Sequence, residues 1–310
     1  MKNLLVILGP TASGKTRLGV ELARDLKAEI ISADSRQVYR ELDIGSGKDL
    51  EEYRTGGPPV AHHLIDIVDL EVEFNVFDFQ KRFYETFEEL QSRSTPGIVV
   101  GGSGLYLEAV LKGYRMVEVP ENPALRTELI SLSTEELGRR LQTHREVHNT
   151  TDLVDRDRLV RAVEIAEYSL DHQPEPGPRI NSIVLGVRWD RAVLRKRIRE
   201  RLALRLQGGL IEEVRDLHER GISWEKLHFL GLEYRFVSEF LQGRIRNRND
   251  LQQKLAAAIA AFAKRQETWF RRMQRRGTEI HWIDRGDVHK AREIIARCGG
   301  VGCDPAPTRQ

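Results

Sequence analysis

A glycine-rich segment, Gly9 to Thr16, has the residue types and spacing that bind phosphate. Its sequence, GPTASGKT, fits G-x-x-x-x-G-K-T and lies between an apolar run, Leu4 to Leu8, and a stretch with helical spacing. In that setting backbone N–H groups surround phosphate oxygens, and the helix N-terminus and Lys15 add positive charge. The Thr16 hydroxyl is placed to ligate Mg²⁺. The predicted phosphate-binding residues are Gly9, Pro10, Thr11, Ala12, Ser13, Gly14, Lys15 and Thr16.

Two further polar residues follow apolar runs that are typical of buried strands. Asp34 follows the run from Ala28 to Ser32, and Ser103 follows Ile98 to Val100 within the sequence GGSG. Ligands of an open parallel sheet bind at the carboxyl ends of its strands, so we expect Asp34, Ser103 and the glycine-rich loop at one edge. Asp34 could hold Mg²⁺ through water or accept a proton, and Ser103 could donate to a phosphate or bridging oxygen. Each could instead cap a helix or turn.

Strands that alternate with helices predict an α/β fold, a parallel sheet with helices on both faces as in P-loop NTPases. Residues 118–178 show several helical patterns and little strand signal, so we expect a small helical insertion domain there. Residues 1–117 and 179–310 would form the core, with a basic, helical C-terminal part. The other expected helices lie at 15–26, 77–93, 190–208, 250–276 and 288–297, and the other strands at 180–187 and 279–283.

Composition excludes several classes of protein. The 310 residues are 40% hydrophobic and 31% charged, which is enough apolar material for a core and excludes disorder as the main state. No apolar run approaches the roughly 20 residues that cross a bilayer. Met1 leads directly into the first expected strand, and the two cysteines cannot complete a zinc site, so we expect no signal peptide and a reducing, cytoplasmic location. Residues 190–276 contain 21 lysines and arginines but 11 acidic residues, which fits a polyanionic partner and equally fits a solvated, arginine-rich helix.

Beyond the phosphate loop, the sequence resembles the tRNA dimethylallyltransferases over nearly its whole length. The resemblance includes DSRQVY at 34–39, DIG at 43–45, GGSGLY at 101–106, DRLVRA at 157–162, Arg197 and Arg201 before GLIEEV at 209–214, and AKRQ at 263–266 with Trp269 and Phe270. These blocks occur in the family's order. Together they are much more specific than the phosphate loop alone.

The resemblance implies transfer of a dimethylallyl group from dimethylallyl diphosphate to N6 of adenosine 37, in the anticodon stem-loop of tRNA. Asp34 would be the general base, Ser103 would lie near the bridging oxygen, and Arg201 and Arg197 would lie beside the diphosphate. The loop and Mg²⁺ would hold that leaving group. The implied tRNA-binding residues are Asp34, Ser35, Arg36, Gln37, Ser103, Arg126, Asp157, Arg158, Leu159, Val160 and Arg161. Lys264, Arg265, Arg271 and Arg272, beside Trp269 and Phe270, are further candidates for that surface.

The sequence departs from the family pattern at several places. The helical insertion looks short, and the residues just before Asp157 keep little of the usual pattern. The family continues Asp-Ile-Gly with Thr-Ala-Lys-Pro, whereas this chain has SGKD at 46–49. The family block Ile-Gly-Tyr-Lys/Arg-Glu reads LGLEYR at 230–235, and Ser103 stands where the family has threonine. The diphosphate half of the site is therefore better matched than the RNA half.

Three other functions fit parts of the sequence. A P-loop kinase would use ATP as donor and Asp34 as base for a small acceptor, but no lid with paired arginines is recognisable. A related prenyltransferase would act on free adenine nucleotides, which leaves the basic helices without a purpose. A non-catalytic RNA-binding relative would not need Lys15, Thr16 and Asp34. We expect the protein to work as a monomer.

Overall fold

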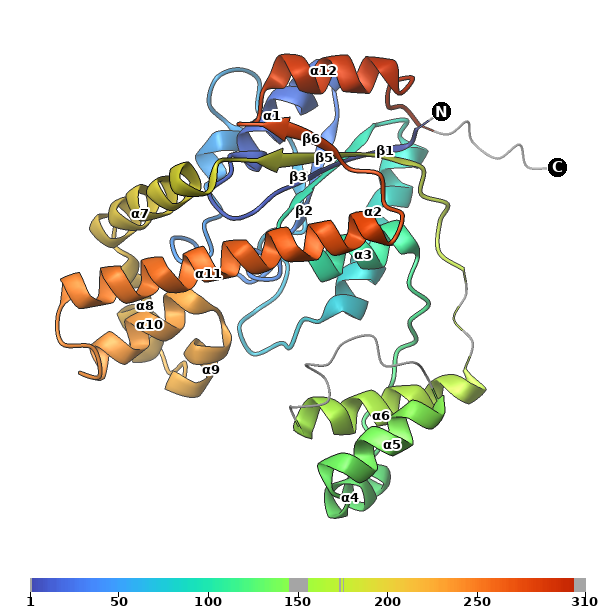
Figure 1. The fold of residues 1–310 in the computed structure, drawn as a ribbon, viewed down its shortest axis with the longest axis vertical. Helices are drawn as coiled ribbons and strands as arrows, with labels where there is room; N and C mark the ends of the chain where they lie inside the picture. Colours follow the sequence, from blue (N-terminus) through green and yellow to red (C-terminus); the bar gives the residue numbers. More distant parts are fainter. Residues whose placement is uncertain (1, 145–155, 173, 175, 304–310) are drawn as a thin grey trace. The chain divides into compact units, whose positions relative to one another are not determined.

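The computed structural model describes residues 2–144, 156–172, 174 and 176–303. The chain divides into two compact units, one formed by residues 1–112 and 178–310 and the other by residues 113–177 (Figure 1). The first unit contains the sheet and the second contains helices.

The sheet of the first unit has six parallel strands in the order β3-β2-β4-β1-β5-β6. They are β1 (Leu4–Leu8), β2 (Glu29–Ala33), β3 (His62–His63), β4 (Gly97–Gly101), β5 (Ser182–Arg188) and β6 (His281–Asp284). The predicted α/β fold is confirmed, with strand boundaries displaced by one or two residues. Strand β3 was not predicted, because two histidines form no apolar run.

Alternating side chains of β1 supply two apolar cores, one on each face of the sheet. Leu5 and Ile7 pack with α1 (Lys15–Leu26) and α12 (Val288–Arg297). Leu4, Val6 and Leu8 pack with α2 (Val76–Ser92), α3 (Gly104–Lys112) and the end of α11 (Arg248–Arg275). Figure 1 shows these helices on opposite sides of the strands. Because both faces are covered, β1 is buried along its whole length and fixes the loop that follows it.

A third core joins the helices beyond β5. It contains residues of α7 (Arg191–Gln207), α8 (Leu210–Glu219), α9 (Trp224–Phe229), α10 (Leu232–Leu241) and the first half of α11. Helix α7 begins where predicted, because the Asp190 carboxylate accepts hydrogen bonds from the N–H groups of Ala192 and Val193 at 2.8 and 3.3 Å. This core sets α7 and α11 side by side.

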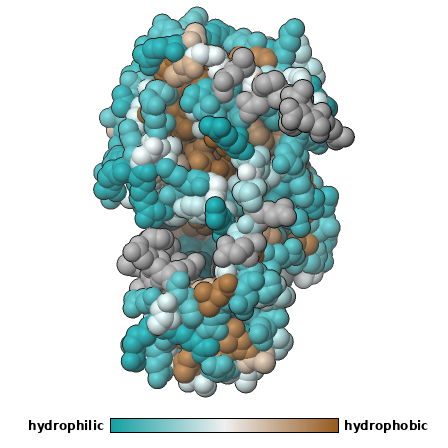
Figure 2. Space-filling model, turned by 90° about the vertical axis from the view of Figure 1, so that its right-hand side faces the viewer, coloured by the Kyte–Doolittle hydropathy of each residue, from teal (hydrophilic) through white to brown (hydrophobic). Residues whose placement is uncertain are grey.

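The second unit consists of α4 (Pro123–Ser131), α5 (Thr134–His144) and α6 (Arg156–Asp171). Leucines from all three helices form its small core. Among the described residues, no helix in either unit is both long and apolar enough to span a membrane. The face of the molecule in Figure 2 is mostly hydrophilic, with scattered apolar patches.

Candidate active site

The glycine-rich loop connects β1 to α1 at the carboxyl edge of the sheet. Gly14 has φ of +84°, a left-handed conformation that glycine adopts without a steric penalty. A Cβ at Gly9 would lie 2.8 Å from Ser13 Oγ and 3.1 Å from the Val187 carbonyl, so the loop also needs a small residue there. The loop therefore has the compact backbone that its sequence predicted.

Two side chains that follow β5 hold the loop from outside. Trp189 Nε1 donates to the Ser13 carbonyl at 2.8 Å, and Arg197 Nε donates to the Ala12 carbonyl at 2.9 Å. The Arg197 guanidinium also lies over the Trp189 ring, 4.4 Å from its centroid. Arg197, which was predicted to lie beside the diphosphate, contacts the loop through its Nε, and its contact with a diphosphate stays a prediction.

Gln266 of α11 links the loop to the end of β4. Its Oε1 accepts from the Thr11 N–H and its Nε2 donates to the Gly102 carbonyl, both at 2.9 Å. The side chain is 8% exposed. The sequence placed Gln266 in a motif block without giving it a role, since a contact across 255 residues leaves no local signal.

Lys15 and Arg201 concentrate positive charge at the loop. Arg201 Nη2 donates to Thr11 Oγ1 at 2.7 Å. Burial lowers the pKa of Lys15 to about 8, although the nearby Asp34 carboxylate opposes the shift. Burial, followed by the nearby Arg205, lowers the pKa of Arg201 to about 10. These cations are costly to keep charged in the free protein, and an anion in the loop would relieve that cost.

Asp34 and Ser103 come together from neighbouring strand ends. Ser103 N–H donates to the Ala33 carbonyl at 3.3 Å, and Ser103 Oγ accepts from the Ser35 N–H at 3.1 Å. Asp34 Oδ1 accepts hydrogen bonds from the N–H groups of two residues in the following turn. No residue that the structure describes donates a hydrogen bond to Oδ2. One carboxylate oxygen is therefore fixed by the turn, and the other is left to accept a proton.

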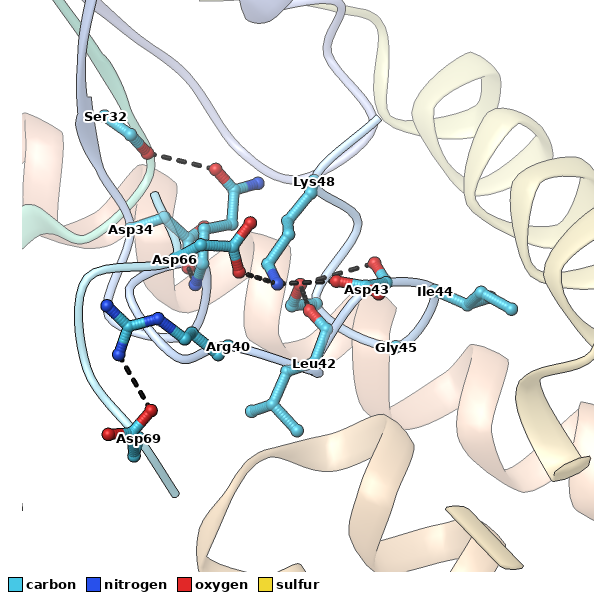
Figure 3. Close-up of polar contacts among 12 residues, drawn as sticks. Ser32, Asp34, Arg40, Leu42, Asp43, Ile44, Gly45, Lys48, Asp66 and Asp69 are labelled. Carbon is cyan, nitrogen blue, oxygen red and sulfur yellow. Dashed lines mark hydrogen bonds and ion pairs between the residues drawn. The ribbon is translucent and has the colours of Figure 1, made fainter. Parts of the chain in front are cut away.

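A segment after Asp34 is anchored by the buried cation Lys48. Its Nζ contacts Asp43 Oδ1 at 2.6 Å and also pairs with Asp66, as Figure 3 shows. The Glu213 carboxylate accepts from the N–H groups of Ile44 and Gly45 at 2.7 and 3.0 Å. The Asp-Ile-Gly block is thus held by a glutamate of the GLIEEV block, which explains why both blocks accompany the phosphate loop.

The remaining predicted RNA contacts of this unit follow Asp34 directly. Gln37 Nε2 donates to the Gly47 carbonyl at 2.9 Å, and the Arg36 guanidinium lies 5.3 Å from the centre of the Phe229 ring. Ser35, Arg36 and Gln37 are all partly exposed.

A basic groove of about 730 Å³ lies between α7 and α11. Its cationic side chains are Arg191, Arg195, Arg199 and Lys264, and no acidic residue lines it. None of the four forms an ion pair with a residue that the structure describes. Four alanines and the amides of Asn249, Gln252 and Gln253 complete the groove. A backbone of phosphates is the kind of ligand that such a surface accepts.

The aromatic residues that were proposed for the RNA-binding surface, and the arginine beside them, make contacts inside the protein. Phe270 is fully buried in the core beneath β4, so it does not face solvent. Arg272 lies 3.9 Å from the Trp269 ring centroid and pairs at 3.0 Å with Glu108, which is also buried. Phe270 and Arg272 therefore belong to the packing of α11 against α3.

In the helical unit, two of the predicted RNA-binding arginines converge on one buried acid. Arg126 Nη2 lies 3.2 Å from Glu164 Oε2, and Arg161 pairs with the same oxygen. Although burial alone would raise the pKa of Glu164, hydrogen bonds from the Asn122 N–H and both arginines lower it. Both arginines are therefore paired within the unit, and their contact with RNA stays a prediction.

The rest of the predicted segment in α6 divides into two faces. Leu159 and Val160 are buried in the core of the unit at 0% and 8% exposure. Asp157 and Arg158 are exposed. Only the latter two present their side chains to solvent.

A resident metal site built from protein side chains is not found among the described residues. No group of three or more His, Cys, Asp and Glu side chains is arranged to hold a metal ion there. Thr16, at the start of α1, supplies one hydroxyl. Mg²⁺ is commonly held by few protein ligands together with substrate phosphates, so this single hydroxyl fits such an ion.

Comparison with known proteins identifies the family. A family model described as IPP transferase matches residues 37–273. The tRNA dimethylallyltransferase 1 of Syntrophus aciditrophicus is 58% identical over 300 residues, covering 95% of this chain and 98% of its own. This chain belongs to the IPP transferase family. The family's tRNA dimethylallyltransferase 1 of Geotalea uraniireducens is 56% identical over 301 residues, covering 96% and 98%.

Solved structures agree with this assignment. The tRNA isopentenylpyrophosphate transferase of Bacillus halodurans has a TM-score of 0.70 and 31% identity, covering 96% of each chain. A eukaryotic dimethylallyltransferase acting on tRNA has a TM-score of 0.76 at 21% identity, covering 96% of this chain and 78% of its own, which shows the common fold. The family predicted from the motif blocks is confirmed, as is the expectation of a transferase.

Proposed function

We propose that this protein transfers the dimethylallyl group of dimethylallyl diphosphate to N6 of adenosine 37 in tRNA, and that it works as a monomer. One observation carries the proposal: the phosphate loop, Ser103 and Asp34 follow three adjacent parallel strands, β1, β4 and β2. This arrangement provides an anion site, a hydroxyl and a carboxylate along one edge of the sheet.

The donor half of the site binds the diphosphate. The N–H groups of the loop and of the α1 N-terminus, with the ammonium of Lys15 and the guanidinium of Arg201, surround the phosphate oxygens. When bound through the Thr16 hydroxyl, Mg²⁺ supplies further neutralisation of the leaving group. Arg197 keeps the loop in shape through the Ala12 carbonyl. These charges act most strongly as the allylic C–O bond breaks and its electron pair moves to the diphosphate.

The acceptor half activates a weak nucleophile. The lone pair of the adenine N6 amine is delocalised into the ring, so N6 attacks well only as its proton is removed. Oδ2 of Asp34 accepts that proton while the N6–C bond forms, and Oδ1 stays bound to the turn. Ser103 Oγ accepts from the Ser35 N–H, which leaves its own O–H to donate to the bridging oxygen.

RNA is held by phosphate contacts and by base-edge contacts. The groove between α7 and α11 offers four cations along a stretch whose arginines, Arg191 to Arg199, span about 12 Å of helix. A nucleic acid strand carries about one charge per 3.4 Å of axis, so about three to four phosphates match that length. Ser35, Arg36 and Gln37 would contact the flipped adenosine and its neighbours. In the helical unit, Asp157 and Arg158 would face the RNA.

The test offers labelled dimethylallyl diphosphate and Mg²⁺ to the protein with unmodified tRNA, with AMP or with water alone. We expect prenylated tRNA, with the label on the adenosine beside the anticodon. Equal labelling of AMP would make a free nucleotide the acceptor. Phosphate release from ATP without any prenylated product would favour a kinase and overturn the proposal.

A further inference from the structure

Arg205 is a buried cation next to the phosphate loop whose hydrogen-bonding groups are not satisfied. The residue is 9% exposed. Its ion pairs are long, at 3.8 Å to Asp49 Oδ2 and 3.7 Å to Glu233 Oε1. Within the described residues Arg205 forms no side-chain hydrogen bond, and its Nη2 is buried without a partner. A buried guanidinium usually has its N–H groups bonded, so the unpartnered Nη2 of Arg205 is available to donate to an anionic ligand.

The position of Arg205 relates it to the donor site. It follows Arg201 by one helical turn on α7, and the two arginines line one small cavity together with Thr11 and Ala12 of the phosphate loop. The remaining walls of that cavity are apolar. An anion in the loop therefore has two guanidinium groups on the same side, of which Arg201 already contacts Thr11.

The segment opposite α7 is shaped to admit this guanidinium. Gly47 has φ of +69°, and a Cβ at that position would collide with Nη2 of Arg205. The ion pairs of Lys48 with Asp43 and Asp66 fix the next residue of the segment. Gly47 and Asp49 belong to the SGKD segment and Glu233 to the LGLEYR segment, the two places where this chain departs most from the family pattern. Both departures therefore meet at Arg205.

The charges around Arg205 are suited to exchanging one anion for another. Burial raises the pKa of Glu233, because its carboxylate loses solvation and its contact with Arg205 only partly compensates. Asp49 is 46% exposed, so it can move away from the arginines at little cost. A diphosphate carries more charge than either carboxylate and accepts several hydrogen bonds at once.

We propose that Arg205 is a second diphosphate-binding arginine, which holds the donor's phosphate oxygens together with Arg201. Asp49 and Glu233 keep its side chain directed at the loop when no donor is bound. The inference rests on the proposed function only in that the donor is a prenyl diphosphate. It extends the anion site by one turn of α7 beyond the residues that the family motifs name.

The experiment measures the dissociation constants of inorganic pyrophosphate and dimethylallyl diphosphate by calorimetry, in the presence of Mg²⁺. For Arg205→Gln we expect binding of both ligands to weaken 10- to 100-fold, with tRNA affinity unchanged and partial recovery in Arg205→Lys. Lys196→Gln removes one charge from the exposed face of the same helix and should leave both constants unchanged.

A second variant separates binding from a purely structural role. Asp49→Asn removes a carboxylate that competes for the arginines, so we expect it to bind pyrophosphate several-fold more tightly. A structural ion pair predicts unchanged or weaker binding in that variant. Unchanged constants in Arg205→Gln, or no gain in Asp49→Asn, would overturn the proposal for Arg205. Failure of the wild-type protein to bind pyrophosphate at all would instead overturn the donor site itself.

Discussion

Arginines of the phosphate-loop unit and of the helical unit have opposite surroundings. In the first unit Arg201 donates to Thr11 of the loop, and its only ion-pair partner in the described chain is Asp49 at 4.0 Å. In the second unit Arg126 and Arg161 pair with the buried Glu164. Charges of the first kind are available to a ligand, whereas charges of the second kind are used in folding. A motif match at an arginine is therefore stronger evidence for ligand binding in the phosphate-loop unit than in the helical unit.

The largest effect on activity is expected at Asp34, which lies in the phosphate-loop unit. Asp34→Asn keeps an oxygen for the turn but removes the base, so the rate of transfer should fall by at least about 10²- to 10⁴-fold. Binding of dimethylallyl diphosphate should change little, because the loop is untouched. Single-turnover kinetics and calorimetry measure the two quantities. Equal loss of binding and turnover would assign Asp34 to the metal or to the fold.

Arg201 tests whether a cation at the loop serves the ligand. A charged hydrogen bond contributes about 1.5–3 kcal/mol, so Arg201→Ala should weaken donor binding roughly 10- to 100-fold. The melting temperature should stay close to that of the wild type, since the ion pair of Arg201 is long and its guanidinium is itself costly to keep charged in the free protein. An unchanged dissociation constant for the diphosphate would remove Arg201 from the site.

Arg126 tests the opposite case in the helical unit. Arg126→Gln removes one of two cations from a buried carboxylate, and we expect the unit to lose about 1–3 kcal/mol of stability. Hydrogen exchange of amides in α4 and α6 would report the loss. Arg139→Gln, at an exposed position of α5, is the control in the same unit and should leave exchange unchanged. If Arg126→Gln instead reduced tRNA affinity without faster exchange, the contrast between the two units would fail.

Sequence patterns predicted the elements well where the pattern is local. Helices 15–26 and 288–297 have the predicted boundaries, because apolar residues recur at helical spacing and α12 follows the capping residue Asp287. The convergence of Asp34 and Ser103 followed from the parallel sheet alone. Strand β3 has two residues and no such pattern.

Contacts between distant segments could not be predicted in this way. Gln266 reaches Thr11 and Glu213 reaches Gly45 across more than 160 residues, and Arg205 meets Asp49 and Glu233 from separate segments. Leu159 and Val160 were assigned to RNA by resemblance, yet their apolar side chains complete a core. A motif shows that a segment matters but not which of its side chains face the ligand.

The lowered pKa of Lys15 gives the donor site a dependence on pH. In the free protein burial lowers this pKa to about 8, so above that pH the amine is neutral and diphosphate binding must take up a proton. The titration of Lys15 should leave the diphosphate affinity constant below pH 8 and lower it up to tenfold per pH unit above that value. Calorimetry in buffers of different ionisation enthalpy measures the uptake. The arginine in Lys15→Arg stays charged throughout, so this variant should take up fewer protons on binding than the wild type. Protonation of the ligand itself is common to both proteins, so the difference in uptake reports the side chain at position 15.

The smallest effect is expected in the groove, where each cation contributes one of several phosphate contacts. In Arg195→Gln/Arg199→Gln, tRNA affinity should fall several-fold, and the slope of log affinity against log salt should become shallower by about 1.4 to 1.8. Lys196→Gln/Arg215→Gln removes the same charge from exposed positions outside the groove and should keep the wild-type slope. The slope is the decisive quantity, because repacking of α7 would weaken binding without changing the number of counterions released. A weaker complex with an unchanged slope would therefore place the RNA elsewhere on the protein.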